Sequence, residues 1–522
     1  MTRIAVVTAD GARDLDAQTI ATLSDSYTLM HRAATAAAEC LHARDERSAA
    51  VYVGTGNNGG DGWLIAGMLR ELGWSVTVHA TEAPKTVDAQ RAKAEAERGG
   101  PFAAPTGTES LMLDAILGTG AAGAPRDAAA DAIAAIRAAR SDAPVRTVVA
   151  IDIASGLDAT TGEDHGAAPA DLTVTFGSVK RGHLLRRDLT GELVLLDIGL
   201  VDADAETPRL VTASDVSACL PTLLPDAYKG TRGRVAIVGG AAGMAGAVIL
   251  AARGAHASGA GMVRADVADA SMLALQIAAP FATVQAWRGT DWSGIDTAWP
   301  DALVIGPGLD GTASHVRDRV LALLYAYAGP VVLDAGALTA FGASPRIDDG
   351  EGNDDGEGDP LLSLRHALRG RQALLTPHVG EFRALRRSDA PIARFDDPAA
   401  LARELNATVL LKGVPTVIAA PDGTRYVSAT GTPALAMGGT GDLLSGIVGA
   451  LLAQGLSALD AGAAAAYVHG AAAERATQAH GGWRGVTMDL LLREVTDVWP
   501  ALDAPPSLPP HTVLALPAVP PR

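Results

Sequence analysis

The chain has 522 residues, enough for two or three domains with sizeable cores. Its net charge of -17 argues against a nucleic-acid binder, which needs a basic face. Its two cysteines, Cys40 and Cys219, are too few and too far apart for a disulfide framework or a metal cluster. No apolar run reaches the ~18 residues that span a bilayer, and the N-terminus lacks a signal-peptide pattern. We therefore expect a cytoplasmic protein without nucleic-acid or membrane partners.

The first half of the chain alternates apolar runs with alanine-rich stretches of helical length. The runs of strand length cover residues 49–53, 75–80, 111–117, 147–153, 172–176 and 193–199. Strands that alternate with helices are typical of a parallel sheet covered on both faces. This pattern predicts an α/β domain over residues 1–205.

A glycine-rich turn, GTGNNGGDG (54–62), follows the first run and has the spacing G-x-G-x-x-G of dinucleotide-binding turns, with Glu82 near the expected acidic position. Asn57, Asn58 and Asp61 crowd this turn, whereas a Rossmann turn presents mainly backbone. At a helix start, Asp61 also competes with a pyrophosphate for the same N–H groups. A plain N-cap and a ligand contact both remain open for Asp61.

Two further polar turns follow predicted strands. Asp114 stands near a strand end ahead of the glycine turn 118–124, and Asp152 ends the next strand and is followed by Ser155. Ligands of parallel sheets bind outside the carboxyl ends of the strands, where these turns could converge. Each turn alone is equally typical of ordinary turn chemistry, but together the three favour a ligand site.

The motifs NNGGDG, DAILGTG, DIASGLDATTG and FGSVKRG, over roughly residues 10–200, resemble the NAD(P)HX epimerase domain of the bifunctional NAD(P)H-hydrate repair enzymes. The resemblance implies a Rossmann-like three-layer fold, in which Asp152 contacts substrate as the acid/base residue near C6 of the hydrated nicotinamide ring. It implies a potassium ion (K⁺) held by Asn58, Asp114 and Ser155, whose hard oxygen ligands suit such a cation. Lys180 matches a lysine of the family pattern, and a surface lysine is an equal alternative. The other implied substrate contacts are Asn57, Asn58, Gly59, Gly60, Asp61, Gly118, Thr119, Gly120, Ala121, Ala122, Gly123 and Ala124.

A polar segment, 201–212, is a plausible linker to a second α/β series. Its predicted strands begin with 234–240 and continue with 302–308, 330–336, 373–378 and 408–413, which indicates a domain over residues 214–500. The acidic, glycine-rich stretch 348–359 is typical of a disordered surface insertion. The proline-rich residues 501–522 predict a tail without a helix or a central strand.

The stretch AMGGTGDLLSGIVGALLAQG (436–455) places three glycines before a strongly apolar helical run. Glycines there let backbone N–H groups approach a phosphate, and the helix dipole favours its negative charge. Asp442, at the helix start, can take the proton from a hydroxyl that attacks a phosphoryl group. A plain N-cap role for Asp442 would leave the glycines unexplained, and the Walker pattern of P-loop enzymes is absent from the sequence.

That stretch, together with YKGTRGRVAIVGG, ALVIGPGLD, LLTPHVGEFRAL and LLKGVPTVI, resembles the ribokinase-like ADP/ATP-dependent NAD(P)H-hydrate dehydratase over about residues 214–495. The resemblance implies several ligand contacts, some of which have ordinary alternatives. His378 could be a loop histidine and Lys412 a strand-end lysine. Ala247 and Gly308 could be packing residues. The implied substrate contacts are Ala247, Gly308, His378 and Asp442, and the implied nucleotide contacts are Lys412, Gly413, Val414, Pro415, Thr416 and Gly441.

The two resemblances together predict a fused metabolite-repair enzyme, an isomerase joined to a lyase. The first domain would interconvert the R and S epimers of hydrated NADH and NADPH (NADHX and NADPHX), and the second would dehydrate the S epimer at the expense of ADP or ATP, with Mg²⁺ on the nucleotide. ADP is favoured because fused members are typically bacterial and use ADP, and a homo-oligomer is expected. The alternative is a ribokinase-like small-molecule kinase with a non-catalytic nucleotide-binding N-terminal domain.

Overall fold

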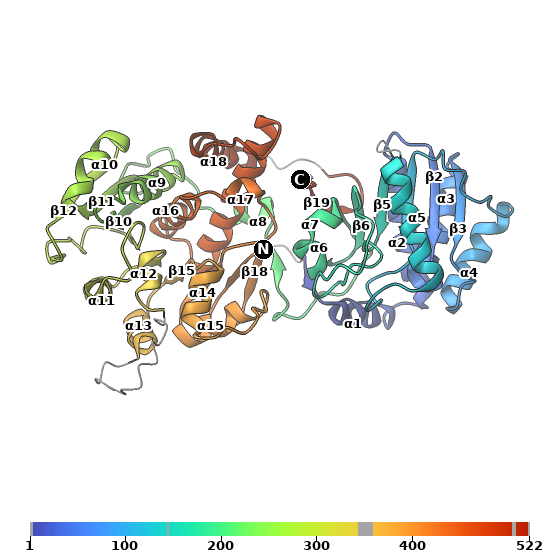
Figure 1. The fold of residues 1–522 in the computed structure, drawn as a ribbon, viewed down its shortest axis with the longest axis horizontal. Coiled ribbons are helices and arrows are strands. Elements are labelled where there is room, and N and C mark those ends of the chain that lie inside the picture. The colour runs from blue at the N-terminus through green and yellow to red at the C-terminus, as the bar shows by residue number, and fades with distance from the viewer. Residues whose placement is uncertain (1–3, 143–145, 343–358, 504–507, 520–522) are drawn as a thin grey trace. The chain divides into compact units, whose positions relative to one another are not determined.

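The computed structural model describes residues 4–142, 146–342, 359–503 and 508–519, and the chain forms two compact units. The first unit holds residues 4–207 together with 508–519, and the second holds residues from 208 to 503 (Figure 1). The predicted acidic insertion 348–359 lies outside the described residues, apart from Asp359. Among the described helices, none is both long enough and apolar enough to cross a membrane.

The first unit is built on a seven-stranded sheet with the order β19-β8-β6-β5-β4-β2-β3. Its strands are parallel except β19, and their apolar residues are buried on both faces, as expected for a sheet covered by helices. The strands are β2 (Ser48–Val53), β3 (Ser75–Ala80), β4 (Leu111–Ala115), β5 (Thr147–Ile151), β6 (Leu172–Phe176), β8 (Glu192–Leu196) and β19 (Thr512–Leu516).

Helices cover both faces of this sheet, which gives three layers. One core joins α2 and α3 to residues such as Val51 and Leu113, and the other joins α5 to their neighbours Ala50 and Met112. A short parallel pair, β1 (Val6–Val7) with β7 (Val179–Lys180), lies beside the main sheet. The helices are α1 (Ala9–Ile20), α2 (Ser26–His42), α3 (Asn57–Glu71), α4 (Val87–Ala96), α5 (Asp127–Asp142), α6 (Arg181–Leu185) and α7 (Arg187–Thr190).

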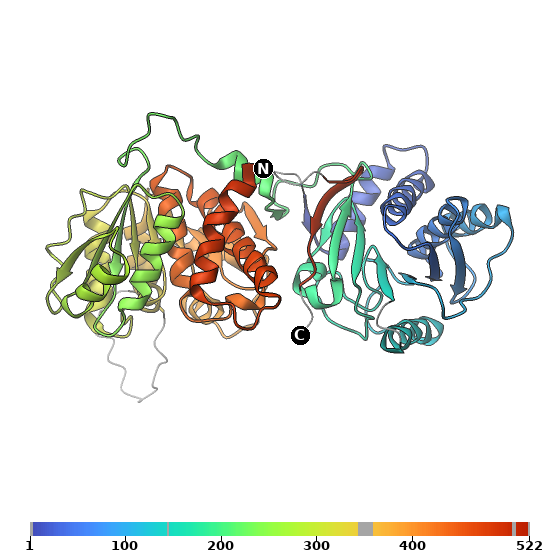
Figure 2. The ribbon, with the colours of Figure 1, turned by 90° about the horizontal axis from the view of Figure 1, so that it is seen from above.

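The C-terminal segment differs in part from the tail without a helix or a central strand that is expected for residues 501–522. Helix α18 (Met488–Asp503) runs past residue 500, and β19 pairs antiparallel with β8 at the edge of the first unit's sheet (Figure 2). The prolines flank β19 rather than interrupt it, and four of its five residues pair with β8, with a register shift between Thr512 and Leu514.

The second unit has a ten-stranded sheet with the order β12-β11-β10-β13-β14-β15-β16-β17-β18-β9. Its strands pair in parallel from β12 to β16, and β17 runs antiparallel to both of its neighbours. They are β9 (Arg209–Leu210), β10 (Arg234–Gly239), β11 (Met262–Ala268), β12 (Thr283–Trp287), β13 (Ala302–Ile305), β14 (Val331–Leu333), β15 (Ala373–Leu375), β16 (Thr408–Leu411), β17 (Thr416–Ala419) and β18 (Arg425–Ser428).

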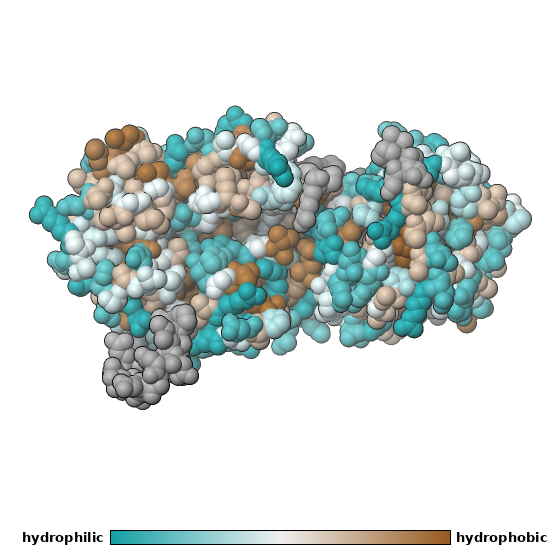
Figure 3. Space-filling view, in the orientation of Figure 1, coloured by the Kyte–Doolittle hydropathy of each residue, from teal (hydrophilic) through white to brown (hydrophobic). Residues whose placement is uncertain are grey.

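Helices again pack on both faces of this sheet. One core contains α9, α16, α17 and α18, and the other contains α11, α13, α14 and α15. Figure 3 shows a hydrophobic patch over α10, where Leu273 and Ile277 are exposed. The helices are α8 (Ala213–Cys219), α9 (Ala245–Ala257), α10 (Met272–Ala278), α11 (Ser314–Ala326), α12 (Gly336–Thr339), α13 (Pro360–Leu368), α14 (Val379–Arg386), α15 (Asp397–Leu405), α16 (Thr440–Ala453) and α17 (Ala458–His480).

The residues that follow the parallel strands of the second unit are joined to the neighbouring strands by backbone hydrogen bonds. Their backbone N–H groups donate to carbonyls at the end of the neighbouring strand, over distances of 2.9 to 3.1 Å. This bonding aligns the polar turns along the carboxyl edge of the sheet, where parallel sheets bind ligands. The residues so joined are Gly306, Asp334, Thr376 and Lys412.

Candidate functional site

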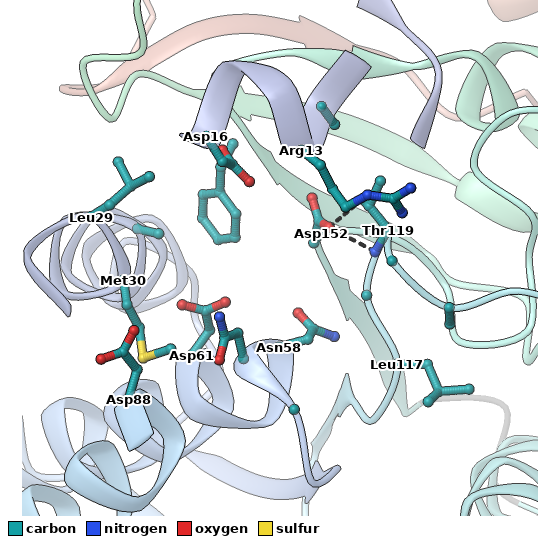
Figure 4. A pocket seen from close by; sticks show the side chains of 18 of the residues that line it. Arg13, Asp16, Leu29, Met30, Asn58, Asp61, Asp88, Leu117, Thr119 and Asp152 are labelled. Carbon is teal, nitrogen blue, oxygen red and sulfur yellow. Dashed lines mark hydrogen bonds between the residues drawn. The ribbon is translucent and has the colours of Figure 1, made fainter. Parts of the chain in front are cut away.

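A cavity of about 510 Å³ opens at the carboxyl ends of β2, β4 and β5 in the first unit (Figure 4). Eight of the residues expected to contact substrate line it, drawn from three separate turns of the chain. Helix α1, which the sequence analysis did not include, adds Arg13 and Asp16. The eight are Asn57, Asn58, Asp61, Gly118, Thr119, Gly120, Ala121 and Asp152.

The other expected contacts do not line this cavity as it is described. A Cβ atom on Gly59 would lie 2.0 Å from the Gly54 carbonyl oxygen, and one on Gly60 would lie 2.8 Å from Cε of Met30. These two glycines therefore let α3 pack closely, and packing accounts for them without a ligand. Ala122, Gly123 and Ala124 also lie outside the cavity lining.

Helix α3 begins at Asn57 with Gly56 as its N-cap, so Asp61 is not the helix cap that the sequence left open. Asp61 instead points into the cavity from α3, and Asp16 points into it from α1 (Figure 4). Desolvation raises the pKa of Asp16 to about 6, while the Lys180 ammonium opposes the shift. The pKa of Asp61 lies well above its usual value because of desolvation and the nearby carboxylates of Asp152 and Asp16.

Asp152 directly follows β5 and has a left-handed backbone, with φ of 68°. Lys180 Nζ donates to its Oδ1 at 2.5 Å, and the Thr119 hydroxyl donates to its Oδ2 at 2.5 Å. His183 Nε2 lies 3.0 Å from the Asp152 carbonyl oxygen. Burial alone would raise the pKa of Asp152, but the Lys180 ammonium and the hydrogen bonds outweigh it and lower that pKa to about 2. The cavity therefore presents an ionised carboxylate at neutral pH.

Asp114 and Ser155 form a buried pair beside this carboxylate. The Ser155 hydroxyl donates to Asp114 Oδ1 at 2.5 Å, and the Ser155 N–H donates to Oδ2 at 2.8 Å. Burial raises the pKa of Asp114, against the hydrogen bonds from Ser155 and Ile116. Both amide atoms of Asn58 are buried without a hydrogen-bond partner within the described part of the chain. An unpaired buried amide is costly, so a ligand that donates a hydrogen bond to its oxygen, or a cation that this oxygen coordinates, would stabilise the arrangement.

In the second unit, helix α16 begins at the predicted glycine turn. Gly439 is its N-cap with φ of 95°, a left-handed conformation that favours glycine, and Asp442 lies in the first turn rather than at the cap. The Thr440 hydroxyl donates to the carbonyls of Leu435 and Met437, which fixes the turn. The first N–H groups of a helix have no partner within it, so this end of α16 can accept an anion.

Lys412 joins this helix end to the carboxyl edge of the sheet. Its Nζ donates to Asp334 Oδ1 at 2.9 Å and lies 3.9 Å from Glu381 Oε2. A Cβ atom on Gly441 would lie 3.3 Å from the same nitrogen, so the ammonium borders the start of α16. Burial and Asp334 raise the pKa of Asp442 to about 7, Lys412 lowers it, and Glu381 raises it further. Asp442 is thus poised to exchange a proton near neutral pH.

The other residues expected in the second unit are placed less directly. His378 is exposed and caps α14, with its Nδ1 accepting from the N–H groups of Gly380 and Glu381, and its contact with substrate stays a prediction. A Cβ atom on Gly308 would lie 3.1 Å from Cβ of Ala247, so these two residues adjoin each other.

The expected nucleotide segment, Lys412 to Thr416, is held by hydrogen bonds. Arg394 Nη1 donates to the carbonyl of Pro415 at 3.1 Å and to that of Lys412 at 3.4 Å. The Thr416 hydroxyl donates to the Gly413 carbonyl at 3.0 Å, and Val414 is exposed between them. Arg394 lies before this segment in the chain, and no motif of the sequence indicated it.

Two families match the chain, one in each unit. Residues 26–182 match the family described as YjeF-related protein N-terminus, and residues 235–497 match that of NAD(P)H-hydrate dehydratase. The bifunctional NAD(P)H-hydrate repair enzyme Nnr of Moorella thermoacetica is 35% identical over 416 residues, which cover 73% of this chain and 74% of the relative. The enzyme of the same name from Escherichia coli is 35% identical over 422 residues, 77% of this chain and 76% of the relative.

Among solved structures, the ADP/ATP-dependent NAD(P)H-hydrate dehydratase from Bacillus subtilis, co-crystallised with ATP and Mg²⁺, is 30% identical. It aligns with 56% of this chain and 99% of its own, with a TM-score of 0.47. The α/β class expected from the sequence is confirmed by the two sheets and their helical layers. The expected family is confirmed by the two family matches and by relatives that align across both units. The chain belongs to the family of bifunctional NAD(P)H-hydrate repair enzymes.

Proposed function

We propose that this chain repairs hydrated NADH and NADPH with two activities, an epimerase in the first unit and a dehydratase in the second. Membership of the family supports both activities. One observation supports placing one activity in each unit: each unit has a carboxylate at a predicted ligand site. The first lies at the carboxyl edge of the sheet, and the second lies at the N-terminal end of a helix. Asp152 is ionised inside a cavity large enough for part of a dinucleotide, and Asp442 has a pKa of about 7 at an anion-binding helix end.

In the epimerase site, Asp152 acts on the C6 hydroxyl of the hydrated ring. The hydroxyl proton passes to the carboxylate, and the electrons of the O–H bond form the second bond of a C6 carbonyl. The C6–N1 bond breaks at the same time, and its electrons move to nitrogen. A protonated carboxyl in the same cavity, such as Asp61, can supply the proton that nitrogen takes up. Rotation and reclosure of the ring from the other face then yield the other epimer, and the protons return to their donors.

A potassium ion fits the residues beside Asp152. Asn58 has a buried, unpaired amide oxygen, and Asp114 and Ser155 supply a carboxylate and a hydroxyl oxygen. Oxygen donors of these kinds suit a hard cation. When bound, the ion would supply positive charge that attracts the phosphates of the substrate. Asn58, Asp114 and Ser155 would hold it, and the residues lining the cavity would position the ring.

In the dehydratase site, Asp442 takes the proton of the S-epimer hydroxyl while the hydroxyl oxygen attacks the terminal phosphorus of ADP or ATP. The bond from that phosphorus to the bridging oxygen breaks, so AMP or ADP leaves. The N–H groups at the start of α16, with Lys412, stabilise the charge on the transferred phosphoryl group. The C6–O bond of the new phosphate ester then breaks and releases inorganic phosphate, while a proton leaves C5. This elimination restores the double bond of NAD(P)H. Mg²⁺ would neutralise the nucleotide phosphates, and the carboxylates of Asp334 and Glu381 beside Lys412 are suitable donors for it.

The test is recovery of absorbance at 340 nm from a mixture of R and S hydrated NADPH with ADP, Mg²⁺ and K⁺. Wild type should recover the whole mixture, Asp442→Ala none of it, and Asp152→Ala the S fraction alone. The exposed Asp131→Ala serves as the matched carboxylate control and should behave as wild type. Enough enzyme must be used to outrun spontaneous epimerisation. Absence of recovery by wild type with either ADP or ATP would refute the dehydratase and favour the small-molecule kinase.

Four points stay predictions from the sequence: the use of ADP rather than ATP, the cytoplasmic location, the homo-oligomer, and the absence of nucleic-acid and membrane partners. Parallel assays with ADP and ATP, and light scattering on the purified chain, would test the first and the third of them.

A further inference from the structure

The cavity wall of the first unit contains a lysine in an unusual environment. Lys180 is 3% exposed, and its Nζ donates to Asp152 Oδ1 at 2.5 Å and to the Thr175 hydroxyl at 2.8 Å. Burial of an ammonium group is costly unless it is paired and hydrogen-bonded. A surface lysine, the alternative that the sequence left open, is therefore ruled out, and a role inside the cavity has to explain the burial.

We propose that Lys180 is a positioning residue of the epimerase site, whose ammonium group keeps the Asp152 carboxylate ionised and turned toward the substrate. The inference rests on the proposed epimerase function and deepens it. Lys180 holds one carboxylate oxygen, and the Thr119 hydroxyl and N–H hold the other at 2.5 and 3.2 Å. With both oxygens fixed from the protein side, the carboxylate has one orientation relative to the cavity.

The other charged groups around Asp152 make this cation necessary. Asp16 on α1 and Asp61 on α3 face the same cavity, and the charge of Asp152 raises the pKa of both carboxyls. His183 on α6 is neutral, because burial lowers its pKa to about 3. Arg13 on α1 also lines the cavity, but its side chain is more than half exposed. Lys180 on β7 is therefore the main side chain that compensates the buried charge of Asp152.

His183 offers a matched control, because it holds the same two residues without charge. Its Nδ1 accepts from the Lys180 N–H at 3.3 Å, and its Nε2 consequently donates to the Asp152 carbonyl at 3.0 Å. Its ring thus ties the left-handed backbone of Asp152 to the backbone of Lys180. Loss of His183 perturbs geometry, whereas loss of the Lys180 ammonium perturbs geometry and charge together.

The experiment follows conversion of purified R hydrated NADH into the S epimer by chromatography, from pH 5.5 to 8, in K⁺ and without ADP. Omitting ADP keeps the dehydratase and its own pH dependence out of the measurement. Wild type gives the reference profile, which carries any titration of Asp16 and Asp61 in the same cavity. In Lys180→Met the uncompensated carboxyl should take up a proton, since burial without a counter-charge raises such a pKa by up to about 3–5 units. Its rate should then fall about tenfold per pH unit below a midpoint near pH 6–7.

Two further variants separate charge from structure. Lys180→Arg keeps the cation and should keep the shape of the wild-type pH profile, even where its rate is lower. His183→Asn should lower the rate by the same factor at every pH. Lys180→Gln removes the charge while keeping a donor for Thr175, and it should show the same acid limb as Lys180→Met if the latter fails to fold. Thermal unfolding and ADP-dependent dehydration of the S epimer by the same chain report on folding.

A Lys180→Gln or Lys180→Met profile with the same shape as that of wild type, whether the rate is unchanged or uniformly reduced, would overturn the inference. An acid limb of equal midpoint in Lys180→Arg would also overturn it, because the cation would then be irrelevant. Failure of wild type to interconvert the epimers is a different result, since it refutes the proposed epimerase function itself.

Discussion

The dehydratase rate should depend on pH through Asp442. The proposed base must be ionised, and burial together with Asp334 raises its pKa to about 7, so activity falls as the pH drops through this value. One pH unit below the pKa, about one carboxyl in ten is ionised, and two units below, about one in a hundred. About one carboxyl in two is ionised at pH 7, so we expect kcat to fall about fivefold between pH 7 and pH 6, about tenfold between pH 6 and pH 5, and to level off above pH 8.

The assay measures the initial rate at 340 nm with purified S hydrated NADH, saturating ADP and Mg²⁺. Using the S epimer keeps the epimerase site out of the rate. Asp334→Asn removes a carboxylate whose charge raises the pKa of Asp442, so its acid limb should move to lower pH. Lys412→Met removes the cation that lowers this pKa, so its limb should move to higher pH. The two variants thus shift the same midpoint in opposite directions.

A wild-type profile that is flat from pH 5.5 to 8.5 would refute the reasoning, because it would show that no group with a pKa near 7 limits the reaction. A shift in the same direction for both variants would also contradict it, since their charges act on Asp442 with opposite signs. Asp442→Ala, which should lack the activity at every pH, is the baseline for both comparisons.

Three further predictions concern both units. Asp152→Asn should lose R-to-S conversion by chromatography while S-epimer dehydration at 340 nm is unchanged; equal loss of both would contradict separate sites. Replacing K⁺ by tetramethylammonium should slow epimerisation reversibly, and Asn58→Leu should abolish this response to K⁺. The same variant should not lower the Tm in K⁺-free buffer, because it removes a buried amide that has no hydrogen-bond partner within the described part of the chain. Gly446→Ala should lower the free energy of unfolding, measured by calorimetry, by about 1–3 kcal/mol, since its Cβ would lie 1.9 Å from the Ala251 carbonyl oxygen. Gly246→Ala should leave this free energy unchanged or raise it, because nothing lies within 4 Å of its Cβ.

The residues of the epimerase cavity that could be predicted are those governed by a local rule. Asn58, Asp114 and Asp152 each follow or end a parallel strand, and all parallel strands of a sheet end at one edge, so their convergence follows from the strand pattern alone. The same rule accounts for Lys412 at the end of β16. Turn chemistry and strand periodicity are readable over a few residues, which is why these positions stand out in the sequence.

The rest of the site depends on contacts between distant segments. Lys180 is buried because β7 pairs with β1, whose residues lie more than 170 positions earlier. Asp16 belongs to a helix that precedes the first strand of the main sheet and ends no strand. In the second unit, Asp334 is set against Lys412 by a hydrogen bond between residues 78 positions apart. No pattern within a short window indicates such pairings.

The edge strand β19 shows the same limit, and it also has a consequence for synthesis of the chain. Its partner β8 leaves the ribosome about 300 residues earlier, which at 5–20 residues per second is roughly 15–60 seconds. During that interval the backbone groups of β8 on this side have no strand to pair with, and exposed edges of this kind invite pairing between nascent chains. The epimerase sheet is completed last although it starts first, so a gene split after residue 205 would encode an epimerase with an uncovered edge, prone to aggregate unless the last segment is supplied in trans.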